Sequence, residues 1–483
     1  MAIFQSLDKF EVAQKQYEFL PFKFGRIKDR VVLTNFAGEH YLCGQDVFKD
    51  FVEQKLDKNS KTYRELRSRH FLIDQQSQIA KKLLAIKYKS RLSRLSDFTT
   101  LHMFVVSLRC EHSCPYCQVS RQSDNKLAFD MSEETASKAI DFALSGPSSF
   151  MKFEFQGGES LLNFDLVRFI VEVALERNKA FNKNLSFVIA TNLAVVTDEM
   201  LNFCKLHQID ISTSLDGPSN VHDYNRPRPG KNSHELTLKG IERARLKLGF
   251  DRVSALMTTT EKSLENVKPI IDEYLSLGFD GIFLRPLSPY GFAVKTKKYN
   301  AYDERRWFEF FRQGLEYIIE INKSGTYFQE FYSSMILKKI LTFSDPGYVD
   351  LRSPAGIGIA GIVYNYDGKI FASDEGRMLA EMGDRTFEIG DLNNDTFKTV
   401  FTNEKLLEPI EKSMSLSAPR CSDCVYEQYC GADPVFHYAT SGDFLGRKAE
   451  SAFCYRNMNT FEYLITKYED DPVVRKIFES WIS

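Results

Sequence analysis

The stretch MFVVSLRCEHSCPYC, residues 103–117, places three cysteines directly after the pattern of a buried strand. Met103–Leu108 is a short, continuous apolar run of the kind that forms a strand buried on both faces. Cys110, Cys114 and Cys117 follow on a loop of about eight residues, so their thiolates can hold one face of a cube-shaped iron–sulfur cluster. The fourth iron of such a cluster would have no protein ligand. The spacing therefore favours a 4Fe–4S cluster with one open iron.

Structural zinc is the alternative for the same cysteines. Zinc in structural sites takes four closed ligands. His112 is the nearby candidate for a fourth, and its position between two cysteines makes simultaneous ligation awkward. The ligand count therefore favours iron and sulfide over zinc.

The region from residue 100 to residue 290 alternates between strand and helix patterns. The apolar runs are Met103–Leu108, Lys152–Phe155, Leu185–Ala190, Ile209–Ser214, Val253–Met257 and Gly281–Leu284. Amphipathic stretches between them include Glu133–Leu144, Asp165–Arg177 and Glu265–Leu277, and Ser132 is a candidate N-cap for the first of these. This alternation predicts an α/β fold with a parallel sheet. Six units rather than eight predict a partial (β/α)6 TIM-like barrel, with chemistry at the carboxyl ends of the strands.

Candidate ligand contacts stand where the later strands end. Gly157 and Gly158 let backbone approach a ligand closely, and the carboxylate of Glu159 can accept from an ammonium group. Alone, this tripeptide is more often a plain turn, but one strand after the cysteines it indicates a ligand site. The further candidates are Gln156, Thr191, Asn192, Ser214, Asp216, Arg226 and Arg285. Taken singly, each is equally typical of a loop cap or a surface ion pair.

The cysteine spacing, with Tyr116 directly before the last cysteine, resembles the signature of radical S-adenosylmethionine (radical SAM) enzymes. The resemblance implies that Cys110, Cys114 and Cys117 hold a 4Fe–4S cluster whose open iron chelates the amino and carboxylate groups of S-adenosylmethionine. It also implies reductive cleavage of S-adenosylmethionine to a 5′-deoxyadenosyl radical, which abstracts a hydrogen atom from a substrate. In such an enzyme the protein orients the cofactor and excludes side reactions.

The strand-end motifs are similar to those of the same family. Thr191-Asn192 resembles its Thr-Asn-Gly motif, with Leu193 in place of the glycine. By resemblance, Ser214 and Asp216 lie near the ribose and methionyl groups, and Arg226 lies near the cofactor carboxylate. The resemblance likewise makes cofactor contacts of Tyr116, Gln156, Gly157, Gly158, Glu159, Thr191 and Asn192.

A second cysteine group resembles the C-terminal SPASM domain of peptide-modifying radical SAM enzymes. Its members are Cys421, Cys424, Cys430 and Cys454. The SPASM domain usually carries two auxiliary 4Fe–4S clusters on seven cysteines, and here three of those positions hold Ser373, a non-cysteine after Gly390, and Pro434. The four ligands of the second cluster are all present. We therefore expect one auxiliary 4Fe–4S cluster, fully ligated and suited to electron transfer, with structural zinc as the alternative.

Segments along the whole chain resemble the His-Xaa-Ser system radical SAM maturases, the HxsB family. They are FLPF at 19–22, ASD at 372–374, RMLAEM at 377–382, CGADPVFHYAT at 430–440 and Phe453-Cys454. The resemblance implies a ribosomally made peptide or small protein substrate with His-Xaa-Ser repeats. It also implies an electron donor such as flavodoxin or ferredoxin, and it allows for a leader peptide and a companion maturase.

Four regions are expected. Residues 1–95 form a small α+β domain that is either a winged-helix-like peptide-recognition domain, binding a leader peptide as an added strand, or a structural cap. Residues 96–290 form the partial barrel, residues 291–350 a helical linker region, and residues 351–483 a SPASM/twitch-like iron–sulfur domain with a C-terminal helix. The strongly basic run Lys81–Arg94 is expected to be a solvated helix.

The overall composition limits the kinds of partner that the protein is expected to bind. Lysine plus arginine (63) nearly balances aspartate plus glutamate (65), so no global field selects nucleic acid or a membrane surface. The first residues lack a signal-peptide pattern and no apolar run approaches 18 residues, which predicts a cytoplasmic protein. Cys43 and Cys204 stand apart from both groups and are expected to be small buried residues.

The sequence thus predicts a radical SAM maturase that modifies a peptide by hydrogen-atom abstraction. One alternative is an enzyme like the anaerobic sulfatase maturases, which should carry both auxiliary clusters. The other alternative, of a different class, is a zinc-stabilised peptide-binding protein without catalysis. Which product forms, a crosslink, an epimer or an oxidised side chain, does not follow from the residues.

Overall fold

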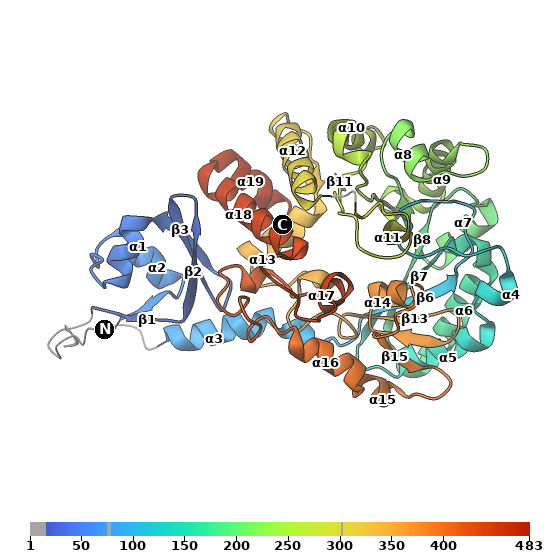
Figure 1. The fold of residues 1–483 in the computed structure, drawn as a ribbon, viewed down its shortest axis with the longest axis horizontal. Coiled ribbons are helices and arrows are strands. Elements are labelled where there is room, and N and C mark those ends of the chain that lie inside the picture. The colour runs from blue at the N-terminus through green and yellow to red at the C-terminus, as the bar shows by residue number, and fades with distance from the viewer. Residues whose placement is uncertain (1–15, 75–78, 301–302) are drawn as a thin grey trace.

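A computed structural model describes residues 16–74, 79–300 and 303–483. Its central strands are β6 (Leu101–Ser107), β7 (Phe150–Gly157), β8 (Asn184–Thr191), β9 (Asp210–Ser214), β10 (Val253–Leu256), β13 (Gly361–Tyr364), β14 (Lys369–Phe371) and β15 (Glu388–Asp391). They form one sheet in the order β10-β9-β8-β7-β6-β13-β14-β15 (Figure 1). Strands β6 to β10 and β13 are parallel, whereas β14 and β15 are antiparallel to their neighbours.

Helices cover the outer face of the parallel strands and confirm the predicted α/β class. They are α5 (Glu133–Leu144), α6 (Phe164–Phe181), α7 (Asp198–Leu206), α8 (Ser219–Asn225), α9 (Ser233–Leu248) and α10 (Val267–Ser276). Ser132 caps α5 as predicted, since its hydroxyl accepts from the Thr135 N–H at 3.1 Å. The core between sheet and helices is aromatic: the rings of Phe104 and Phe153 lie 5.0 Å apart, and those of Phe153 and Phe187 lie 5.9 Å apart.

The sixth predicted strand differs from expectation. β11 (Gly281–Ile282) is two residues long and pairs with β12 (Gln329–Glu330) in a separate small sheet, not with β10. Gly281 permits this pairing, because a Cβ there would lie 2.6 Å from the Gln329 carbonyl oxygen. The buried Glu330 carboxylate then accepts from the Leu284 N–H at 3.1 Å, which ends the ladder. The apolar run was correctly found, but its partner is a distant segment.

The C-terminal part extends the barrel sheet through the predicted hairpin. β13 and β14 flank a turn in which Gly368 has φ +83°, and the Asn365 N–H donates to the Lys369 carbonyl at 2.9 Å. The surrounding helices are α4 (Lys126–Phe129), α11 (Phe292–Lys295), α12 (Glu304–Lys323), α13 (Phe331–Leu341), α14 (Asp374–Ala380), α15 (Phe397–Phe401), α16 (Glu404–Lys412), α17 (Pro434–Ser441), α18 (Ala452–Asp470) and α19 (Pro472–Ser480). The boundaries expected at 95, 290 and 350 stay predictions.

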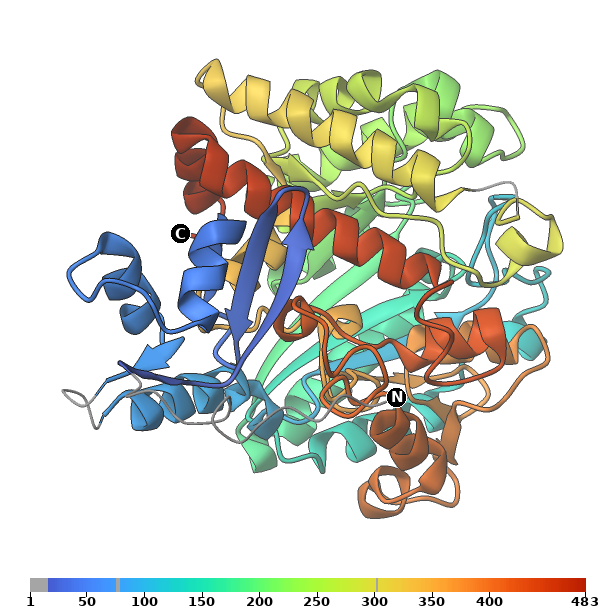
Figure 2. The same ribbon diagram turned by 60° about the vertical axis from the view of Figure 1, so that its left-hand side comes forward.

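The N-terminal part is a small α+β unit. It contains β1 (Glu18–Phe19), β2 (Phe22–Ile27), β3 (Arg30–Asn35), β4 (His40–Gly44), α1 (Gln45–Val52), α2 (Lys61–Ser68), β5 (Leu72–Ile73) and α3 (Ala80–Arg91). Figure 2 shows its antiparallel β2-β3-β4 sheet beside the long helix α18. Arg30 pairs with Asp470 at 2.6 Å, and His40 pairs with Glu469 at 3.0 Å across this junction.

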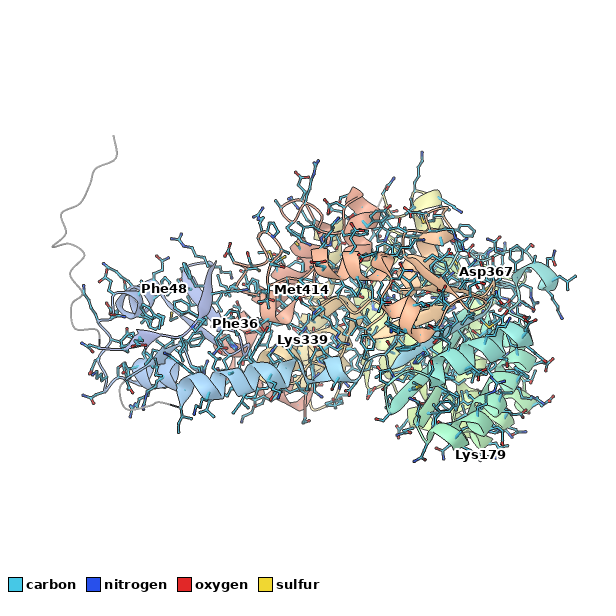
Figure 3. The ribbon with its side chains drawn as sticks, turned by 90° about the horizontal axis from the view of Figure 1, so that it is seen from below. Phe36, Phe48, Lys179, Lys339, Asp367 and Met414 are labelled. Carbon is cyan, nitrogen blue, oxygen red and sulfur yellow. The ribbon has the colours of Figure 1, made fainter. Side chains whose placement is uncertain are left out.

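The basic helix α3 runs along the underside of the molecule, between the N-terminal unit and the rest (Figure 3). Most of its lysines are exposed, as the sequence predicted, but its last residue is not. Arg91 is buried and donates to the carbonyls of Ala37 at 3.1 Å, Lys339 at 2.9 Å and Gln428 at 2.7 Å. One guanidinium thereby links three parts of the chain.

Within the three described ranges, the helices are all too short or too polar to cross a bilayer.

We expect His102→Asn to reduce the loss of stability in acid. His102 is fully buried, and burial lowers its pKa to about 3 from 6.5. Below pH 6.5 the unfolded chain therefore binds a proton at His102 that the native chain does not bind. The contribution of neutral His102 to the free energy of unfolding is complete above pH 6.5 and is lost as the pH falls. It amounts to about 2 kcal/mol between pH 6.5 and about pH 5. Urea unfolding at both pH values measures it. His207→Asn, at the partly exposed end of α7, is the control, and identical pH slopes for all three proteins would contradict the expectation.

Candidate active site

A cavity of about 240 Å³ opens at the carboxyl ends of the parallel strands. The predicted residues that line it are Cys110, Cys114, Tyr116, Cys117, Gln156, Gly157, Gly158, Thr191, Asn192, Ser214, Arg226 and Arg285. These residues come from segments spread over nearly the whole barrel sequence, and the parallel strands bring most of them to one edge of the sheet. Two expected residues, Glu159 and Asp216, lie behind this wall.

The cysteine loop leaves strand β6 and is held at both ends. The Ser113 N–H donates to the Pro227 carbonyl at 2.8 Å, and the Phe292 N–H donates to the Cys117 carbonyl at 2.7 Å. Burial raises the pKa of the Cys110 thiol, and it raises that of Cys114 to about 12. Thiols in such surroundings ionise when a bound cation supplies the compensating charge. The loop therefore fits a metal cluster better than a free nucleophile.

Gly157 and Gly158 bring strands β6 and β7 unusually close together. Gly157 has φ +142°, and a Cβ there would lie 1.9 Å from the Ser107 carbonyl oxygen. A Cβ on Gly158 would lie 2.2 Å from the Arg109 carbonyl oxygen. These contacts show why glycine is required: the two strand ends meet directly beside the first cysteine.

Glu159 lies behind the wall and supports it. Its carboxylate accepts from the Thr191 hydroxyl at 2.5 Å and from the backbone N–H groups of Asn192 at 2.8 Å and Leu161 at 3.0 Å. Burial, with the neighbouring Glu111 carboxylate, raises its pKa. In this geometry Glu159 orients the Thr191-Asn192 turn, and the ammonium contact expected from the sequence stays a prediction.

Asp216 also lies behind the wall and fixes two lining residues. It is fully buried and accepts from the Tyr116 hydroxyl at 2.6 Å and from the Arg226 guanidinium at 3.0 and 3.2 Å. Burial alone would raise the pKa of Asp216, but the Arg226 charge brings it below its usual value. Asp216 thus positions Tyr116 and Arg226, and its own contact with the cofactor stays a prediction.

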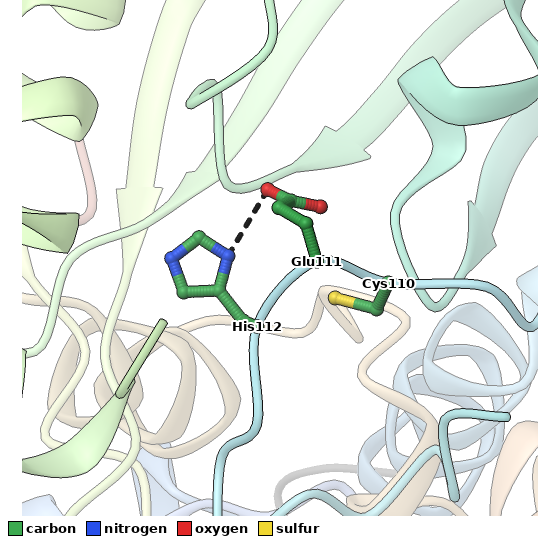
Figure 4. Close-up of side chains that lie close together, drawn as sticks. All are labelled: Cys110, Glu111 and His112. Atoms are coloured by element: carbon green, nitrogen blue, oxygen red, sulfur yellow. Dashed lines mark hydrogen bonds and ion pairs between the residues drawn. The ribbon is translucent and has the colours of Figure 1, made fainter. Parts of the chain in front are cut away.

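His112 is engaged on both sides of its ring. Its Nδ1 lies 3.0 Å from Glu111 Oε1, and its Nε2 lies 2.7 Å from the Ser233 hydroxyl. Figure 4 shows the side chains of Cys110, Glu111 and His112 close together, with the contact between Glu111 and His112 dashed. Their possible ligand atoms all lie within 4.8 Å of one another. Because both ring nitrogens already have partners, His112 fits a structural role in the loop better than a fourth zinc ligand.

Leu193 occupies the position of the glycine in the Thr-Asn-Gly motif that Thr191 and Asn192 resemble. It has φ +61°, a conformation that costs a leucine more than a glycine. Gly240 on helix α9 makes room for it, because a Cβ on Gly240 would lie 2.6 Å from the Leu193 Cβ. The substitution is thus accommodated by a second glycine, and Thr191 and Asn192 keep their places in the wall.

Several residues of the site were not found from the sequence. Arg109 is buried directly before Cys110 and makes a bidentate pair with Asp130 at 2.7 and 2.8 Å, which anchors the root of the cysteine loop. Asp374 and Met378 of helix α14 also line the cavity. The apolar run of β6 ends before Arg109, and α14 reaches the site only through tertiary packing. The sequence pattern therefore carried no signal for these residues.

The second cysteine group surrounds a separate cavity of about 280 Å³. Cys421, Cys424, Cys430 and Cys454 all line it, and burial raises the pKa of each thiol. Four thiols around one cavity fit a 4Fe–4S cluster or a tetrahedral zinc ion.

The positions that depart from the SPASM pattern have structural uses. The Ser373 hydroxyl caps helix α14 by accepting from the Gly376 N–H at 3.1 Å. Asp395, the residue in place of the cysteine after Gly390, accepts from the Asp391 N–H at 2.9 Å. Pro434 is the first residue of helix α17, which Asp433 caps. The described chain thus uses these positions for helix capping and for a local turn.

The Radical SAM superfamily pattern matches residues 104–281, which carry the first cysteine group and the carboxyl ends of strands β6 to β10. An uncharacterized protein of Methanothermobacter thermautotrophicus is 34% identical over 189 residues, which is 39% of this chain and 67% of that protein. The chain belongs to the radical SAM superfamily. It is accordingly an enzyme whose barrel takes a 4Fe–4S cluster and S-adenosylmethionine.

Similarity beyond the barrel points to maturases. The cysteine-type anaerobic sulfatase-maturating enzyme of Clostridium perfringens is 22% identical over 344 residues, covering 66% of this chain and 84% of that enzyme. A structure of native anSMEcpe with bound AdoMet and Cp18Cys peptide superposes with a TM-score of 0.63 at 16% identity, covering 79% of this chain and 99% of the other. This radical SAM enzyme is therefore related to sulfatase maturases, and it shares its fold with a peptide-bound member.

We expect Asp216→Asn to weaken both the fold and the binding of S-adenosylmethionine. The change leaves the Arg226 charge without its buried partner, a loss of about 3–5 kcal/mol in the free energy of unfolding. Tyr116 and Arg226 also lose their fixed positions, so affinity for S-adenosylmethionine should fall by about tenfold, or roughly 1.4 kcal/mol. Urea unfolding and equilibrium dialysis measure the two effects.

Asp198→Asn is the matched control. Asp198 pairs with Arg243 at the surface, where both side chains are about half exposed or more, so its loss should change stability by less than about 1 kcal/mol. Equal effects of the two substitutions would show that Asp216 has no special positioning role.

Proposed function

We propose that this radical SAM enzyme is a maturase that modifies a ribosomally made peptide or small protein of the His-Xaa-Ser type. It would do so by hydrogen-atom abstraction. The observation that carries the proposal is the pair of cysteine-lined cavities: three thiols line the cavity of the barrel, and four thiols line the cavity of the second cysteine group. Three ligands leave an iron open for a cofactor, whereas four leave none.

The first cavity fits the cofactor pair. Cys110, Cys114 and Cys117 would hold the cluster, and Arg226 and Tyr116 offer a cation and an aromatic ring to S-adenosylmethionine. When bound, this pair supplies a 5′-deoxyadenosyl radical. The chain itself positions the cofactor through Asp216 and the Glu159-supported turn, and it places the reacting group inside a walled cavity.

The auxiliary site is proposed to hold a single 4Fe–4S cluster on Cys421, Cys424, Cys430 and Cys454. A site with four protein ligands is suited to relaying an electron rather than to binding substrate. The use of Ser373, Asp395 and Pro434 in helix capping and a local turn supports one auxiliary cluster instead of two.

The peptide substrate is supported by the fold shared with a peptide-bound structure. The His-Xaa-Ser repeats, a leader peptide bound by residues 1–95, an electron donor such as flavodoxin or ferredoxin, and a companion maturase follow from the family resemblance. A cytoplasmic location likewise stays a prediction.

An enzyme like the sulfatase maturases is the alternative to be separated. The 22% identity to one of them favours it, and it should need the second auxiliary cluster. The other alternative, a zinc-stabilised peptide-binding protein without catalysis, does not agree with membership in the radical SAM superfamily.

We expect anaerobically purified protein to contain about eight irons and eight sulfides per chain. Cys114→Ala should remove about four of each and abolish the formation of 5′-deoxyadenosine from S-adenosylmethionine. Cys424→Ala should remove the other four while reductive cleavage continues, because the barrel site is intact. Iron and sulfide analysis with chromatography of the nucleoside products gives the result. About twelve irons would favour the two-cluster alternative, and zinc in place of iron would overturn the proposal.

The substrate is tested by co-expression with a candidate His-Xaa-Ser peptide. The proposal expects the peptide isolated with the wild-type enzyme to differ, in mass or in residue stereochemistry, from the peptide isolated with Cys114→Ala. Mass spectrometry measures the peptide mass, and chiral amino-acid analysis measures the stereochemistry of its residues. An unmodified peptide by both measures would overturn the substrate assignment while leaving the radical SAM chemistry in place.

A further inference from the structure

The cavity of the auxiliary site is built from two distant parts of the chain. Its four cysteines come from residues 421–454, but part of its wall is Phe24, Gly25 and Arg26 of strand β2. The N-terminal unit therefore borders the thiols directly. No feature of the cysteine spacing suggests this arrangement.

The contact between the two parts is close at Gly25. A Cβ on Gly25 would lie 2.9 Å from the Cγ1 of Val425, the residue after Cys424. The Thr34 hydroxyl on the neighbouring strand donates to the Val425 carbonyl at 2.5 Å. Strand β2 thus packs on the backbone that carries Cys424, and β3 fastens it there.

A buried ion pair joins the same two parts. Lys23 Nζ lies 3.1 Å from Glu427 Oε2, with the side chains 15% and 4% exposed. Glu427 stands midway between Cys424 and Cys430 in the sequence and lines the cavity with them. The ion pair therefore holds a cation of the N-terminal unit against a residue of the cavity wall, close enough for its charge to act on a cluster there.

We propose that the N-terminal unit is a structural wall of the auxiliary centre, in which Gly25 positions the cysteine loop and Lys23 tunes the reduction potential of its cluster. The inference rests on the proposed auxiliary cluster. A reduced cluster carries one more negative charge than an oxidised one, so a nearby cation favours reduction. Lys23 and Gly25 are positioning residues, since they act through the loop.

The charge effect is tested by Lys23→Met in full-length protein that also carries Cys110→Ala, Cys114→Ala and Cys117→Ala. This background leaves the auxiliary cluster as the reporter. We expect the ratio of reduced to oxidised cluster at a fixed potential to fall about tenfold, or about 59 mV for one electron. An electron paramagnetic resonance titration measures it. Lys58→Met removes an equal charge from an exposed loop of the same unit and should leave the potential unchanged.

A second substitution separates charge from disruption. Lys23→Met leaves Glu427 as an uncompensated negative charge, so adding Glu427→Gln should return most of the lost potential. A double variant that stays as low as, or falls below, Lys23→Met would overturn the electrostatic role.

The packing role is tested by Gly25→Ala against Gly44→Ala in the same background. An added Cβ at Gly25 forces Val425 to move, whereas no described atom lies within 4 Å of a Cβ added at Gly44. We expect Gly25→Ala to lose its auxiliary iron to a chelator several times faster than the wild type, and Gly44→Ala to match the wild type. Equal rates for both would overturn the packing role.

The outcomes also separate this inference from the proposed function. A protein that shows no auxiliary signal in any variant overturns the cluster itself and the inference with it. A normal signal whose potential ignores Lys23 and whose stability ignores Gly25 overturns the inference alone.

Discussion

The close approach of strands β6 and β7 at their carboxyl ends determines the rest of the active site. Gly157 and Gly158 let the two backbones meet where any side chain would clash with the carbonyls of Ser107 and Arg109. Since Cys110 follows Arg109 directly, this contact fixes where the cysteine loop begins. The bidentate pair of Arg109 with Asp130 holds the same point from the other side.

Two buried carboxylates then fix the side chains and backbone that form the wall of the cavity. Glu159 accepts from two donors of the Thr191-Asn192 turn and from the Leu161 N–H, and Asp216 accepts from Tyr116 and Arg226. A buried carboxylate is costly unless its oxygens are fully bonded, so each network is stable in one arrangement and disfavours others. A cofactor that enters this cavity would meet side chains that are already oriented, which lowers the entropy lost on binding.

Much of this could be predicted from sequence, and the limits have a physical reason. Strands, the cap at Ser132 and the Asp-Gly hairpin depend on residues close together in the chain, so local periodicity revealed them. The pairing of β11 with β12 was not predicted, because Gly281 and Gln329 are far apart in sequence. The inward-facing Glu159 and Asp216 were assigned to the site, but the spacing of residues cannot distinguish a carboxylate that lines a cavity from one that supports its wall. Arg91 was predicted to be one more surface cation, because the carbonyl groups that it contacts come from three separate regions of the chain.

The loop that carries the second cysteine group is restrained from several directions at once. Arg91 donates to its Gln428 carbonyl, and the Tyr429 hydroxyl donates to the Gly38 carbonyl at 2.8 Å. Cys454 comes from the first turn of α18, a helix that also pairs with the N-terminal sheet. Restraints of this kind hold the thiols at one cavity, so little conformational entropy would be lost when they bind a metal. The N-terminal unit is therefore part of the reason that the distant cysteines meet, whichever metal they hold.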